Sequence, residues 1–232
     1  MTRISIALVS TALLLVNAAQ AADWVEGKHY SVLPQPQRTN VAPGKIEVME
    51  VFSYGCPACN QFRPSMKKLV SKMPANVQVV YLPASWNAAE NWPTFQRAYL
   101  TAQSLGVAEK GHDAMFDAIW TTGELSVTEA GGQRLKKNLP TIDDIAQLYQ
   151  RVTGVKAADF VAASNSFGVN LKARQADEQI SVMKVPSTPT LVVNGKYRVN
   201  NDNLNSADDV IEVVKFLVAR ESAAAGPPAK KS

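Results

Sequence analysis

The stretch Ile46-Glu47-Val48-Met49-Glu50-Val51-Phe52, followed after three residues by Cys56-Pro57-Ala58-Cys59, is the starting point for this chain. The apolar run predicts a central strand covered on both faces. Pro57 suits the first turn of a following helix. Cys56 is then expected at the helix N-terminus, where unpaired N–H groups and the helix dipole favour a thiolate, the attacking form in disulfide exchange. The pattern therefore predicts a redox pair, with Cys59 as the buried resolving thiol.

Other uses of the two cysteines, which are the only ones in 232 residues, fit less well. A structural zinc site normally takes four Cys or His ligands, and only His29 and His112 remain elsewhere. Haem attachment needs histidine directly after the second cysteine, where Asn60 stands. An inert structural disulfide, the last alternative, would close too small a loop to stabilise much. We expect no metal and no cofactor beyond a redox-active Cys56–Cys59 disulfide.

The first 22 residues are typical of a secretory signal peptide. Arg3 precedes an uncharged apolar run over 4–16, and small residues occupy 17–22. A retained membrane anchor is the alternative, but the run is short for a bilayer. Export predicts an oxidising compartment, where a C-x-x-C pair persists as a disulfide. The formal net charge of +4 without a concentrated basic patch argues against nucleic acid as a partner.

The segment 46–82 is expected to form a strand–helix–strand unit with the cysteines at its first turn. The helix has an apolar face of Phe62, Met66, Leu69, Val70 and Met73, with a kink expected at Pro64. The second strand is Val77 to Leu82, and Tyr30 to Leu33 is expected at a sheet edge.

The rest of the chain is predicted to be helical and then to return to strands. Asn194-Gly195 between Pro189 to Val193 and Lys196 to Val199 predicts a hairpin. Segment 124–138 is ambiguous because Gly131-Gly132 would interrupt a helix. The predicted helices are Pro93 to Leu105, Ala108 to Trp120, Ile142 to Val152 after a Thr141 cap, Ala157 to Ala163, Phe167 to Met183 and Ala207 to Arg220, with 221–232 as a disordered tail.

This order of elements is the layout of thioredoxin with helices inserted, and two separated motifs make the likeness specific. Segments 52–59 and 185–197, in that order, resemble the periplasmic DsbA-type thiol:disulfide oxidoreductases. The resemblance implies an α/β thioredoxin fold, a mixed sheet flanked by helices, with an inserted all-helical domain. The implied division is a thioredoxin-like domain over 23–88 and 165–220 with the helical insert at 89–164.

Carried over by residue, the resemblance makes Cys56 the nucleophile and Cys59 the resolving thiol. It makes Pro189 a cis-proline that faces the two cysteines, and Pro186 is the rival position. The Thr188 backbone would then offer hydrogen bonds to an extended substrate.

Two positions depart from the family pattern. Glu50 matches a buried acid that relays protons in family members, but the lysine that accompanies that acid aligns with Tyr81. Ala58 stands where the commonest motif has histidine, so the Pro57-Ala58 pair is expected to tune the thiolate differently. His29 and His112 are expected to be surface or satisfied structural residues.

The leading functional prediction is a monomeric periplasmic dithiol oxidase. It would pass the Cys56–Cys59 disulfide to reduced exported proteins and be reoxidised by a DsbB-type membrane protein. A disulfide reductase or isomerase is the first alternative, although isomerases of this superfamily generally need a dimerisation domain. A Cu(I)-binding protein using the paired thiolates is the second, and no methionine-rich or histidine-rich tract accompanies it.

Overall fold

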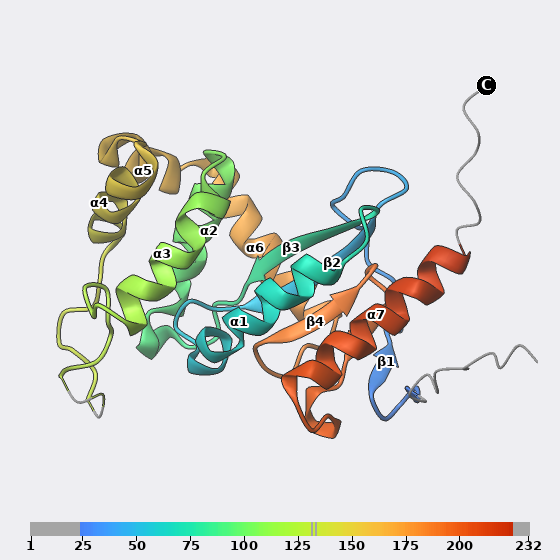
Figure 1. Ribbon diagram of the computed structural model, residues 1–232. Coiled ribbons are helices and arrows are strands. Elements are labelled where there is room, and N and C mark those ends of the chain that lie inside the picture. The colour runs from blue at the N-terminus through green and yellow to red at the C-terminus, as the bar shows by residue number, and fades with distance from the viewer. Residues whose placement is uncertain (1–23, 131, 133, 225–232) are drawn as a thin grey trace, which may run out of the picture.

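The computed structural model describes residues 24–224 apart from 131 and 133 (Figure 1). The predicted signal peptide, residues 1–22, and the predicted tail beyond residue 224 lie outside the described residues. Among the residues described, no helix combines the length and apolar content needed to cross a membrane.

A five-stranded mixed sheet is built around β2, whose seven residues are all buried, which confirms the prediction of a strand covered on both faces. β2 pairs in parallel with β3 and antiparallel with β4, and the edge strand β1 pairs with β5. The strands, in the order β1-β5-β4-β2-β3, are β1 Tyr30–Val32, β5 Tyr197–Val199, β4 Thr190–Val193, β2 Ile46–Phe52 and β3 Val77–Pro83.

The turn between β4 and β5 is the predicted Asn-Gly hairpin. Asn194 and Gly195 have positive φ angles of 51° and 62°, as a two-residue type I′ turn requires. A side chain at Gly195 would also collide with the Gln37 carbonyl, so glycine is needed for space as well as for conformation.

One face of the sheet is covered by α1, Pro57–Lys72, and α7, Ala207–Ala224, which lie side by side in Figure 1. The helix α1 runs through Pro64 to Lys72. Alternate residues of β2 and β4 meet the apolar sides of both helices, because side chains of a strand alternate between faces. This cluster includes Val48, Met66, Leu69, Leu191, Val193, Val213, Val214 and Leu217.

The helices between β3 and the last hairpin form a second group beside the sheet (Figure 1). Met49 and Val51 of β2 belong to the same apolar cluster as Phe95, Phe116 and Ile145 of these helices. A continuous core therefore links them to the sheet, and 89–164 remains our proposed extent of a helical insert. The helices are α2 Trp92–Ser104, α3 Ala108–Trp120, α4 Ile142–Thr153, α5 Ala157–Ser164 and α6 Phe167–Val182, with short 3₁₀ helices η1 Ala88–Glu90 and η2 Asn201–Asn203.

Helix starts and breaks follow local chemistry. Thr141 caps α4 as predicted, since its hydroxyl accepts from the Asp144 N–H and the Asp144 carboxylate accepts from the Thr141 N–H. The described residues of the ambiguous segment 124–138 form no helix and contain one bridge, between Thr128 and Leu135.

The prediction that the tail begins at residue 221 is wrong, because α7 continues to Ala224. The Glu221 residue is only 6% exposed. Its carboxylate accepts hydrogen bonds from Lys196 Nζ at 2.6 Å and Tyr197 Oη at 3.1 Å. These contacts with the hairpin stabilise an additional helical turn beyond the last apolar residue.

Candidate active site

The strand β2 ends in a tight loop that delivers Cys56 to the start of α1. The Cys56 N–H donates to the Ser53 carbonyl at 3.1 Å, and the Gly55 N–H donates to Ser53 Oγ at 3.2 Å. Pro57 then begins the helix as predicted, with Cys56 as its N-cap. The redox pair thus lies at the end of the sheet where β2 meets a helix N-terminus.

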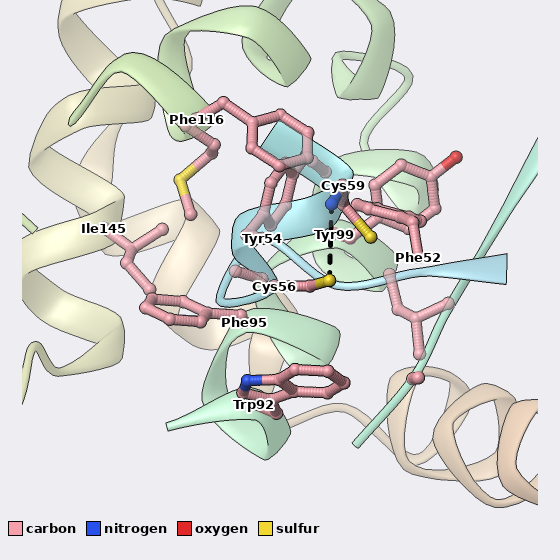
Figure 2. Packing of buried hydrophobic residues seen from close by; sticks show 14 of the residues in the cluster. Phe52, Tyr54, Cys56, Cys59, Trp92, Phe95, Tyr99, Phe116 and Ile145 are labelled. Atoms are coloured by element: carbon pink, nitrogen blue, oxygen red, sulfur yellow. Dashed lines mark hydrogen bonds between the residues drawn. The ribbon is translucent and has the colours of Figure 1, made fainter. Parts of the chain in front are cut away.

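Two tryptophans from the helical group hold this loop. Trp92 of α2 packs so closely on Gly55 that a Cβ there would lie 2.7 Å from the indole ring. The indole N–H of Trp120, the last residue of α3, donates to the Tyr54 carbonyl at 2.8 Å. Figure 2 shows Trp92 and Tyr54 on either side of Cys56. The loop is therefore positioned by α2 and α3 as well as by its own strand.

Both sulfurs are buried free thiols that face each other across the first helical turn. The Cys59 N–H donates to Cys56 Sγ at 3.3 Å, the dashed line in Figure 2. Cys56 Sγ also lies 3.4 Å from the Thr188 carbonyl, to which its thiol donates. Cys56 is thus the sulfur in contact with both the helix start and the Thr188 segment.

The two sulfurs differ in acidity. A hydrogen bond from the Cys59 thiol lowers the pKa of Cys56 to about 6, helped by a hydrogen bond with the Thr188 side chain and by the Cys59 and Ala58 N–H groups, and opposed by burial. Burial raises the pKa of Cys59 well above its usual value, and the neighbouring Cys56 charge raises it further. At neutral pH, Cys56 is therefore the thiolate and Cys59 the protonated thiol.

Glu50 lies beside this pair in β2 and is 4% exposed. Burial raises its pKa to about 8, and the charge of Cys56 contributes in the same direction. No hydrogen bond from the described residues of the chain offsets these two effects. The strand register pairs Glu50 with Tyr81 of β3. Tyr81, the residue that aligns with the family's lysine, is therefore next to the acid. Glu50 is thus protonated at neutral pH.

The bond between Thr188 and Pro189 is cis, whereas the bond before the rival residue Pro186 is not. Pro189 is therefore the cis-proline, as predicted. The Thr188 carbonyl before it faces Cys56 Sγ. Two side chains hold the segment around Pro189, since Thr190 Oγ1 donates to the Ser187 carbonyl at 2.7 Å and Asn201 Nδ2 donates to the Pro189 carbonyl at 2.6 Å.

The histidines lie where a structural role is expected. His112 Nδ1 is 3.1 Å from Tyr54 Oη, and its ring lies 4.4 Å from that of Tyr81. Burial lowers the pKa of His112 to about 4, which keeps the ring neutral at pH 7. His29 Nδ1 accepts from the Val25 N–H at 2.9 Å.

Several residues of the site have no signal in the sequence. Trp92, Trp120 and His112 reach the Cys56 loop from the helical group, and Asn201 reaches Pro189 from the end of β5. Each contact joins segments far apart in the chain, so no local spacing predicts it. The glycine at Gly55, beside the first cysteine, is the one local indication of a close approach.

Comparison with known proteins agrees with this geometry. The family described as Thioredoxin matches residues 42–213. The Thiol:disulfide interchange protein DsbA of Pseudomonas aeruginosa is 33% identical over 94% of this chain and 96% of its own. The crystal structure of the oxidoreductase DsbA from Xylella fastidiosa has a TM-score of 0.74 and 32% identity over 86% of this chain and 98% of its own. A Proteus DsbA variant, solved with the non-covalently bound peptide PWATCDS, has a TM-score of 0.67 and 28% identity over 85% of this chain and 100% of its own.

Proposed function

Because this chain belongs to the DsbA family of thiol:disulfide oxidoreductases, we propose that it donates the Cys56–Cys59 disulfide to reduced exported proteins. The direction of the exchange is supported by the difference in acidity between the two sulfurs. The pKa of Cys56 is lowered to about 6, while that of Cys59 is raised. A stabilised Cys56 thiolate favours the reduced protein, and so favours giving the disulfide away.

The exchange consists of two displacements at sulfur. A substrate thiolate attacks Cys56 Sγ, forming a substrate–Cys56 bond and breaking the Cys56–Cys59 bond, whose electron pair leaves on Cys59. A second substrate thiolate then attacks the substrate sulfur of this mixed disulfide and releases Cys56 as a thiolate. Two substrate thiols thereby lose two electrons and two protons, and the protein's disulfide becomes a dithiol.

Glu50 supplies the proton that the first displacement requires. Cys59 is a poor leaving group as a thiolate because its pKa is raised by burial. In its charged form Glu50 raises the pKa of Cys59, which shows that the two groups interact, and at neutral pH Glu50 is protonated, since its pKa is about 8. In this role Glu50 gives its proton as Cys59 leaves and takes one back when the pair is reoxidised.

The substrate docks as an extended strand beside Thr188. The Thr188 carbonyl lies against Cys56 Sγ, so a peptide paired with this segment would place a cysteine beside the reactive sulfur. The Proteus relative was solved with a non-covalently bound peptide that contains a cysteine, which supports a peptide as the ligand. Reoxidation removes the two electrons, and we propose that their acceptor is a DsbB-type membrane protein that meets this protein in the periplasm. The protein is expected to act as a monomer.

The test is trapping of mixed disulfides in an exporting bacterial cell. Cys59→Ser keeps the Cys56 thiolate but removes the resolving thiol, so mixed disulfides with exported proteins should accumulate. Cys56→Ser is the matched control and should trap almost none. Equal trapping by the two variants would contradict the assigned roles, and no trapping by either would contradict the proposed substrates.

A further inference from the structure

The carbonyl of Pro189 is held by a side chain from another part of the sheet. Asn201 Nδ2 donates to this oxygen at 2.6 Å, and Asn201 begins η2 just after β5. Pro189 lies just before β4, which begins at Thr190. Because proline has no N–H, the carbonyl is the one backbone group through which Pro189 can form a hydrogen bond with the rest of the fold.

The preceding carbonyl is held as well. Thr190 Oγ1 donates to Ser187 O at 2.7 Å. The carbonyls on both sides of Thr188 are therefore fixed, which sets the orientation of the Thr188 peptide between them. The Thr188 carbonyl faces Cys56 Sγ at 3.4 Å, and its N–H has no partner among the residues that the structure describes. This is the group to which an extended peptide would pair.

Packing does not replace the Asn201 hydrogen bond. A cavity of about 210 Å³ lies beside the segment, lined by Pro186, Ser187 and Thr190 on one side and by residues 200–203 on the other. Arg198 of β5 holds the start of the segment through the Met183 and Lys184 carbonyls, whereas at Pro189 the donor from this side is Asn201. Loss of the Asn201 donor would leave the Pro189 carbonyl free to turn toward the cavity.

We propose that Asn201 is a positioning residue for protein substrates: through Pro189 it holds the Thr188 backbone in the orientation that pairs with an extended peptide. The inference rests on the proposed oxidase function. The inference predicts that Asn201 affects two kinds of reductant differently. A small dithiol needs only access to Cys56 Sγ, whereas a peptide also needs the Thr188 backbone.

The experiment compares two reductants of the oxidised protein. One is a synthetic peptide with two cysteine thiols, and the other is dithiothreitol. The variants are Asn201→Ala and Asn201→Asp, the second keeping the size while replacing the donor by an acceptor. The matched control is Asn203→Ala, which removes a neighbouring amide that donates to the Lys28 carbonyl at 2.8 Å and not to Pro189.

We expect kcat/KM for the peptide to fall roughly two- to tenfold in both Asn201 variants, the range of one hydrogen bond, through a higher KM. The dithiothreitol rate should stay at the parent value, as should all readings for Asn203→Ala. Unchanged peptide kinetics, or equal losses with both reductants, would overturn the inference while leaving the oxidase function standing. A parent protein that oxidises dithiothreitol but no peptide would overturn both.

Discussion

Glu50 and Glu221 are both buried carboxylates, at 4% and 6% exposure, yet their surroundings are opposite. Burial also disfavours charge on Glu221, but the Lys196 ammonium and the Asn194 and Tyr197 donors outweigh it and hold its pKa below the usual value. Glu50 has no such donors among the described residues, and its pKa rises to about 8. Of these two carboxylates, Glu221 is paired and charged, whereas Glu50, beside the redox pair, keeps its proton.

The largest expected effect is on stability at Glu50. A pKa of about 8 against 4.5 in the unfolded chain means that folding retains a proton that the unfolded chain has lost. At pH 7 this costs about 3 kcal/mol, so Glu50→Gln should raise the free energy of unfolding by up to that amount. Urea unfolding measures it. A variant less stable than the parent would show that the Glu50 charge is compensated.

The same comparison predicts opposite pH dependences. Because the folded pKa of Glu50 is raised, its contribution makes the protein less stable as pH rises from about 4.5 to about 8. The folded pKa of Glu221 is lowered, so its stabilising contribution is present above the usual carboxyl pKa and is lost as pH falls. Unfolding curves of Glu50→Gln should lack the decline between pH 5 and 8, and those of Glu221→Gln should retain it.

Glu221→Gln should produce the next largest effect, a loss of about 2 kcal/mol, because it weakens charge-assisted hydrogen bonds to the β4–β5 hairpin. Peptide oxidation should be unchanged. Glu212→Gln is the matched control on the same helix, where an exposed pair with Lys215 should contribute less than about 0.5 kcal/mol. Equal losses in the two variants would contradict the structural role of Glu221.

The smallest expected effect is at Ala58. Ala58→His adds a donor and, when protonated, a charge near the Cys56 thiolate, so it should lower the Cys56 pKa and make the protein a stronger oxidant. An added interaction of roughly 1.4 kcal/mol would raise the potential by about 30 mV. Thiolate absorbance and glutathione equilibrium measure the two quantities. No change in either would leave the Pro57-Ala58 pair without a tuning role.

The sequence predicted the elements whose signals are local. The apolar run of β2, the proline after Cys56 and the Asn194-Gly195 turn each specify backbone geometry within a few residues. The family resemblance added the cis bond at Pro189 and the juxtaposition of Glu50 with the Tyr81 position, both of which the structure confirms.

What the sequence could not supply are contacts made by folding. Sequence pattern does not predict the last turn of α7, because Glu221 is a polar residue beyond the apolar face of the helix. The residues that stabilise Glu221 lie 24 to 27 positions earlier in the chain. Asn201 stands in a polar stretch where asparagine is ordinary. Its importance depends on the 2.6 Å hydrogen bond to Pro189, which exists only once β4 and β5 are paired.

The central claim is that the Cys56 environment makes this protein an oxidant, and the redox equilibrium with glutathione tests it most directly. The Cys56 pKa, lowered to about 6, stabilises the reduced form, so the potential of the Cys56–Cys59 pair should lie above about −200 mV. The reduced protein should correspondingly unfold at higher urea concentration than the oxidised one. A potential near the roughly −270 mV of thioredoxin, or below it, would contradict the account and make the protein a reductase.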